Sequence, residues 1–120
     1  MSLKDRTELL TTPEQVDDFL ARNKTAALFK SGSCYKTPEA FVHVKAELEP
    51  REDLPLGIIR VVESRAASNR VAERTGVMHE SPQIFLFKDG QSVFDRDNWD
   101  ITAEDIQAAL VQHFPRPDHS

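Results

Sequence analysis

The sequence predicts an α/β domain in which helices cover both faces of a central mixed sheet of four to five strands. In the first half of the chain, short apolar runs alternate with segments of helical periodicity, which is the pattern of β-α-β units with parallel strands. In the second half, two short strands flank Asp89-Gly90, a dipeptide favoured in two-residue hairpin turns. This hairpin adds antiparallel strands to the sheet.

Caps and apolar runs predict the elements of the first half. Residues 7–11 are expected to form a short opening strand. A helix over 12–22 follows, because Thr12–Gln15 combines a capping threonine, a proline suited to the first helical position and a capping box. The apolar run 25–30 predicts a buried strand, and a second helix with Pro38 in its first turn ends at Pro50.

The same signals predict the elements of the second half. Residues 56–62 form a strand, and 66–75 form a helix that ends at a glycine suited to the left-handed conformation. The strands 84–87 and 92–95 make the hairpin. A last helix over 102–114 begins at a threonine cap followed by acidic residues, which the helix dipole favours there.

The composition is that of one soluble globular domain spanning residues 1–120, with a polar, proline-rich tail at 115–120 that we expect to fray. The net charge of −5 argues against a nucleic-acid surface. We expect no membrane contact and a cytoplasmic location, because no apolar stretch has the length of a signal peptide or a membrane span. The single cysteine excludes an internal disulfide and a thiolate-rich zinc site.

Cys34 is the candidate reactive group, because it follows a buried strand and precedes a helix. The free amides and the dipole at a helix N-terminus stabilise an anion, so a thiolate there has a lowered pKa and reacts near neutral pH. Lys30, at the end of the strand, would add positive charge. The alternative is that Cys34 is a small hydrophobic residue buried in the core, which its polar neighbours disfavour.

A second signal is Ser81-Pro82, directly before the strand 84–87. The proline has either a cis bond or the ordinary trans bond of a strand start. A cis bond would turn the backbone of Ser81 toward the helix that carries Cys34. That backbone would then pair with an extended substrate, as an added strand does.

Two blocks of sequence resemble the monothiol bacilliredoxins of the YtxJ type, a branch of the thioredoxin-like superfamily. The first block is 71–83, which ends in His-Glu-Ser-Pro-Gln, and the second combines Asp89-Gly90 with Asn98–Thr102. The resemblance runs over about 12–114 and implies a thioredoxin-like fold.

The resemblance also implies a function, since family members remove the low-molecular-weight thiol bacillithiol from mixed disulfides on proteins. Carried onto this chain, Cys34 is the attacking thiol, Pro82 is the cis-proline and Ser81 supplies the substrate-binding backbone. Bacillithiol is a co-substrate, the partners are bacillithiolated proteins and a low-molecular-weight thiol, and no metal or organic cofactor is expected. One departure is clear, because the usual Thr-Cys-Pro-Ile-Ser is replaced by Ser33–Thr37.

The remaining candidates for substrate binding surround this motif. Lys30, and Thr102 with the amides of the last helix, would bind the carboxylates of bacillithiol. The alternatives are a cap for Thr102 and a solvated side chain for Lys30. Thr37 occupies the position of a resolving cysteine and is interpreted first as a helix cap before Pro38, and second as a hydrogen-bond donor to the thiolate.

Two nearby aromatic residues are further candidates for substrate binding. Trp99 is either a substrate wall or a packing staple, and Tyr35 is an exposed shelf beside the sulfur. Two non-catalytic hypotheses stay open at this stage: a thioredoxin-like binding module, and a sensor that stores bacillithiol on Cys34 as part of a stress response.

Overall fold

A five-stranded mixed sheet forms the centre of the protein in a computed structural model that describes residues 2–115. The strands are β1 (Thr7–Leu9), β2 (Thr25–Ser31), β3 (Leu56–Arg60), β4 (Gln83–Lys88) and β5 (Gln91–Asp97), in the order β1-β3-β2-β4-β5. β3 is parallel to β1 and β2, whereas β4 is antiparallel to β2 and to β5. The predicted sheet is therefore confirmed, with five strands.

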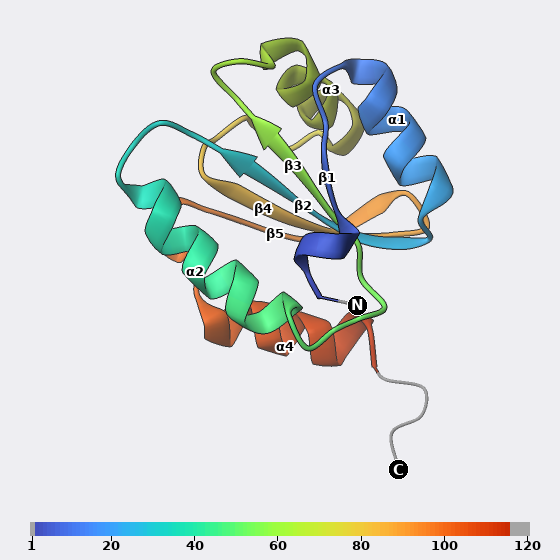
Figure 1. Ribbon diagram of the computed structural model, residues 1–120, viewed down its shortest axis with the longest axis vertical. Coiled ribbons are helices and arrows are strands. Elements are labelled where there is room, and N and C mark those ends of the chain that lie inside the picture. Colours follow the sequence, from blue (N-terminus) through green and yellow to red (C-terminus); the bar gives the residue numbers. More distant parts are fainter. Residues whose placement is uncertain (1, 116–120) are drawn as a thin grey trace.

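Within residues 2–115, four α-helices cover the two faces of this sheet (Figure 1). They are α1 (Pro13–Arg22), α2 (Lys36–Leu48), α3 (Arg65–Thr75) and α4 (Ala103–His113), with short 3-10 turns at η1 (Lys4–Arg6) and η2 (Asn98–Asp100). Figure 1 shows α1 and α3 on one side of the sheet and α2 and α4 on the other. The helix caps predicted at Thr12 and Thr102 are present, and Gly76 ends α3 with a left-handed φ of 71°.

The element boundaries differ from those predicted in several places. The opening strand ends at Leu9 rather than at residue 11, β3 ends at Arg60 rather than at 62, and β5 extends over Gln91–Asp97. In the predicted tail, 116–120 lie outside the described residues.

Alternation along β2 divides the core into two parts. Ala27 and Phe29 face α2 and α4, whereas Ala26 and Leu28 face α1 and α3. Lys30 continues the second series, beneath α3, with its ammonium 5.9 Å from the centre of the Phe85 ring. The strand thus ends with a buried lysine on one face and leads into the loop that contains Cys34.

Among residues 2–115, the helices are too short or too polar to cross a bilayer.

Candidate functional site

Cys34 lies in the connection between β2, at the centre of the sheet, and α2. Its side chain is partly exposed. The backbone N–H of Lys36 is the main cause that lowers the pKa of the thiol, and the hydroxyl and backbone N–H of Thr37 and the charge of Lys36 act in the same direction. Burial opposes them. The net direction is that expected of a thiolate at a helix N-terminus.

Residues 32–35 connect β2 to α2 and contain Cys34, and we call them the reactive loop. Thr37, in the first turn of α2, contacts both ends of this loop. Its Oγ1 accepts a hydrogen bond from the backbone N–H of Gly32 at 3.1 Å and lies within hydrogen-bonding reach of the Cys34 sulfur. The interpretation of Thr37 as the helix cap was wrong, because α2 already begins at Lys36 and Tyr35 occupies the cap position without a side-chain bond. The second interpretation, a hydroxyl group directed at the thiol, fits this geometry.

The Ser81–Pro82 peptide bond is cis, as the family resemblance implied. Ser81 lies against the loop that leads to Cys34, since a Cβ atom added to Gly32 would be only 2.8 Å from Ser81 Oγ and 3.1 Å from Ser81 Cβ. A glycine at position 32 therefore allows the two loops to approach closely. This approach places the backbone of Ser81 near the reactive loop.

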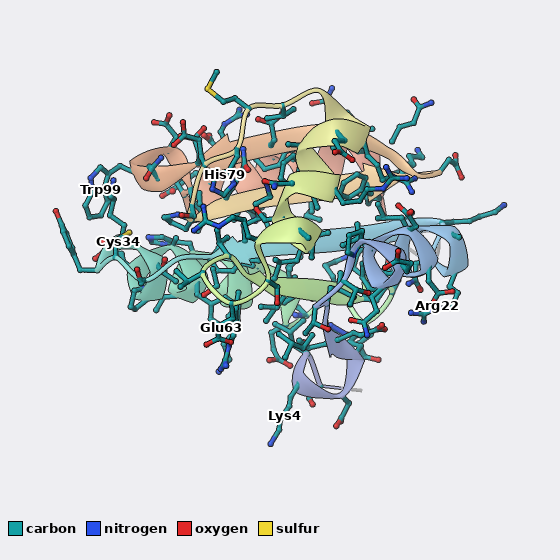
Figure 2. The ribbon with its side chains drawn as sticks, turned by 90° about the horizontal axis from the view of Figure 1, so that it is seen from above. Lys4, Arg22, Cys34, Glu63, His79 and Trp99 are labelled. Atoms are coloured by element: carbon teal, nitrogen blue, oxygen red, sulfur yellow. The ribbon has the colours of Figure 1, made fainter. Side chains whose placement is uncertain are left out.

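Two exposed aromatic side chains flank the thiol. Tyr35 is 78% exposed and Trp99 is 55% exposed, and their ring centroids are 5.9 Å apart. Figure 2 shows Cys34 and Trp99 at the same end of the molecule. The exposed position of Tyr35 agrees with the predicted shelf, whereas the packing staple considered for Trp99 is wrong, because its ring contacts Tyr35 at the surface instead of entering the core.

A polar contact next to this aromatic pair was missed at the level of sequence. Lys36 Nζ donates to Asn98 Oδ1 at 2.9 Å, and Asn98 Nδ2 donates to Glu80 Oε1 at 3.3 Å. The backbone N–H of Asn98 donates to the carbonyl of Pro82 at 3.0 Å. A lysine at the first position of the helix was a visible signal, but its partner is 62 residues away along the chain.

Lys30 does not lie at the substrate-binding surface that was predicted for it. Its side chain is fully buried, its ammonium lies 3.3 Å from His79 Nδ1, and Ser68 Oγ lies 3.1 Å from the same nitrogen. Burial lowers the pKa of Lys30 to about 8. A substrate carboxylate would not reach this ammonium, and the lysine whose charge acts on Cys34 is Lys36 instead.

Thr102 acts as the cap of α4. Its hydroxyl accepts a hydrogen bond from the backbone N–H of Asp105 at 3.2 Å. Thr102 follows η2, the turn that contains Trp99, and two residues, Ile101 and Thr102, join η2 to α4. The capping interpretation is confirmed, and a contact with substrate stays a prediction.

Two shallow hollows border the reactive loop on the side of β3. One of about 160 Å³ is lined by Ser31–Ser33, Val62, Glu63 and Arg60, and another of about 400 Å³ is lined by Thr37, Pro38, Phe41 and neighbouring residues. Ser31 and Arg60 belong to both hollows, so Arg60 is the cation that borders the loop on this side. Within residues 2–115, no group of three histidine, cysteine, aspartate or glutamate side chains is placed to hold a metal ion.

Comparison with solved structures supports the fold and the chemistry. A protein described as a candidate oxidoreductase with a thioredoxin fold superposes with a TM-score of 0.80 at 27% identity, over 92% of this chain and 97% of the other. Thioredoxin O2 from Arabidopsis thaliana has a TM-score of 0.75 at 11% identity, over 95% and 99% of the two chains. Mitochondrial thioredoxin 3 from Saccharomyces cerevisiae has a TM-score of 0.72 at 14% identity, over 92% and 99%. The last two matches show the thioredoxin fold alone.

The family comparison covers most of the chain. The model of the monothiol bacilliredoxin BrxC family matches residues 8–106, a range that contains Cys34, the cis-proline and the aromatic pair. Together with the oxidoreductase neighbour, this match supports a thiol redox role. The chain belongs to the monothiol bacilliredoxin family.

Proposed function

We propose that this protein is a monothiol oxidoreductase that removes bacillithiol from protein mixed disulfides, with Cys34 as the nucleophile. The observation that supports this proposal most strongly is the partly exposed thiol at the start of α2, with a lowered pKa, in a chain of the bacilliredoxin family. A thiolate, and not a thiol, is the species that attacks a disulfide. Cytoplasmic location is part of the same proposal, because turnover needs a reducing thiol pool.

The proposed first step is one thiol–disulfide exchange. The Cys34 thiolate attacks the bacillithiol sulfur of the mixed disulfide, a new sulfur–sulfur bond forms, and the old bond breaks. The electron pair of the broken bond stays on the client sulfur, which leaves as a thiolate and takes a proton from water. The products are the reduced client and a Cys34–bacillithiol disulfide.

An external thiol must complete the cycle. Cys34 is the only cysteine of the chain, and Thr37 stands three residues after it, so no internal thiol can resolve the intermediate. A bacillithiol thiolate attacks the bacillithiol sulfur of the intermediate, which releases bacillithiol disulfide and regenerates Cys34. Bacillithiol is thus both leaving group and reductant in the proposed cycle.

The residues around Cys34 receive roles from their positions. Tyr35 and Trp99 form an exposed aromatic wall beside the thiol, against which the mixed disulfide would pack. The backbone of Ser81, beside Pro82, would pair with an extended segment of the client. Thr37 would stabilise the thiolate, and Thr102 with the first amides of α4 would receive a carboxylate.

The carboxylates of bacillithiol need cations that solvent can reach. Lys30 is buried and is therefore left out of the proposed site. Arg60 is exposed, borders both hollows beside the loop and pairs with Glu63 at 3.5 Å, a surface contact that an incoming carboxylate can displace. We assign Arg60 the part that the sequence analysis gave to Lys30.

The decisive experiment measures release of bacillithiol from a bacillithiolated protein, with free bacillithiol as the reductant. Wild type is expected to turn over and Cys34→Ser to be inactive, whereas Lys45→Met, at an exposed position of α2 outside both hollows, retains activity. Equal rates for wild type and Cys34→Ser would leave the chain as a binding module. A glutathionylated substrate tests the identity of the thiol, and equal turnover of both substrates would contradict the assignment to bacillithiol.

A further inference from the structure

Asn98 occupies an unusual backbone conformation beside the reactive loop. It is the first residue of η2 and has a φ of +52°, in the left-handed region that few residues other than glycine adopt. Asparagine tolerates this region better than most residues. The position therefore accepts asparagine or glycine readily, and the side chain of asparagine has to be explained by its contacts.

The side chain of Asn98 makes three hydrogen bonds, all of them to charged groups. Its oxygen accepts from the Lys36 ammonium at 2.9 Å, and its nitrogen donates to Glu80 at 3.3 Å and to Asp97 at 3.2 Å. An amide is suited to this place because one end accepts from a cation while the other end donates to two carboxylates.

The backbone of Asn98 attaches the same turn to the cis-proline loop. Its N–H donates to the carbonyl of Pro82 at 3.0 Å, and the next residue, Trp99, contacts Tyr35. Two adjacent residues of η2 therefore contact two adjacent residues that follow Cys34. Among the described residues of η2, Asn98 alone is hydrogen-bonded to both the start of α2 and the loop before β4.

We propose that Asn98 is a positioning residue for the reaction of Cys34: its amide holds the Lys36 ammonium beside the thiol, in a place set by the cis-proline loop. The inference rests on the proposed role of Cys34 as the reacting thiol. It adds a function to a residue that touches neither the thiol nor, in the proposed cycle, the disulfide.

The pKa of Cys34 depends on how close the Lys36 ammonium is held to the thiolate. The charge of Lys36 is one of the causes that lower the pKa of Cys34. Without the amide, the long side chain of Lys36 would move into solvent, where its effect on the thiolate is screened. Glu80 and Asp97 accept from the other end of the same amide. The remaining acidic side chains in the first turn of α2 and in η2, those of Glu39 and Asp100, are exposed.

The test measures the pKa of Cys34 from the pH dependence of its alkylation by iodoacetamide, so it needs no disulfide substrate. Asn98→Gly keeps the left-handed backbone and removes only the amide side chain. It is expected to raise the pKa of Cys34 by about half a unit, which slows alkylation about threefold at a pH below the pKa. Lys36→Met is expected to raise the pKa by a similar amount.

A double variant separates positioning from a general loosening of the loops. If Asn98 acts through Lys36, the pKa in Lys36→Met/Asn98→Gly equals that in Lys36→Met alone. The matched control is Asp89→Gly. Asp89 also has a left-handed φ, of 54°, but its backbone N–H donates to the carbonyl of Lys24, just before the start of β2 and far from Cys34 along that strand. It should leave the pKa unchanged.

Two results would overturn the proposal. One is an unchanged pKa of Cys34 in Asn98→Gly, and the other is a double variant whose shift is the sum of the two single shifts. Neither result depends on release of bacillithiol. Failure of the proposed function would appear in the turnover assay, with the alkylation results intact.

Discussion

At the scale of single residues, two lysines close to Cys34 have opposite environments. Lys30 belongs to β2, and strand alternation directs it into the core beneath α3, whereas Lys36 begins α2 and reaches Asn98 across the surface. Both positions were visible in the sequence. Position 30 lies inside the apolar run 25–30 that predicts a buried strand, so the burial of Lys30 follows from the sequence, whereas the contact of Lys36 with Asn98 does not.

The buried ammonium of Lys30 predicts a dependence of stability on pH. Burial lowers the pKa of Lys30 from 10.5 to about 8, so the native state loses this proton at a lower pH than the unfolded chain does. Between pH 8 and 10.5 the unfolded chain binds more protons, and the free energy of unfolding therefore rises with pH across this window, by up to about 3 kcal/mol.

Lys30→Met should remove this rise and stabilise the protein at pH 7, because it replaces a buried charge by an apolar side chain of similar volume. Urea unfolding at several pH values between 7 and 10 measures the effect, and Lys45→Met, at an exposed position of α2, is the control. Parallel stability profiles for wild type and Lys30→Met would show that Lys30 is not a source of the pH dependence.

At the scale of elements, the site is made by three segments that lie at the same end of the sheet, where β2 and β5 end and β4 begins. The start of α2 supplies the thiol and its amide donors, the loop before β4 supplies Ser81 and the cis-proline, and η2 supplies Trp99 and Asn98. The first two segments were predicted from the sequence because each has a local signal: a cysteine between a strand and a helix, and a proline before a strand.

The contacts of the third segment, η2, were not predicted from the sequence. Asn98 and Trp99 belong to a block that carries the family resemblance, but their contacts with Lys36 and Tyr35 join residues more than sixty positions apart. Such contacts depend on the register of β4 against β5 and on the direction that the chain takes after β5. A single sequence provides no local pattern for either property.

The start of α4 gives a prediction about an element boundary. Thr102→Ala should lower the free energy of unfolding by about 1 kcal/mol, because the backbone N–H of Asp105 loses its side-chain acceptor. Thr102→Asp retains a capping oxygen and should retain most of the stability. Thermal or urea unfolding of the two variants measures this difference, and equal losses would contradict the capping role.

The same pair of variants tests the predicted contact of Thr102 with bacillithiol. If a carboxylate of bacillithiol lies at the start of α4, the added charge in Thr102→Asp should raise KM for the bacillithiolated substrate several-fold with little change in kcat. An unchanged KM would limit Thr102 to its role as a cap.

At the scale of the whole molecule, the strand order of the sheet explains why the single cysteine lies beside the cis-proline loop. β2 is the central strand, between β3 and β4, so the loop after it lies beside the loop before β4. Gly32 permits these loops to touch at Ser81. The fold class, the helix order and this edge were predicted from hydrophobic periodicity and turn residues, because those signals are local and repeated through the chain.

In the proposed function, Cys34 takes bacillithiol from a client protein and keeps it until a second thiol arrives. The most direct measurement is the mass of the protein after reaction with a bacillithiolated client in the absence of free thiol. The predicted result is an adduct of one bacillithiol on Cys34, together with one reduced client for each adduct formed. An unmodified Cys34 beside a client that is still bacillithiolated, or a disulfide between Cys34 and the client itself, would contradict the claim.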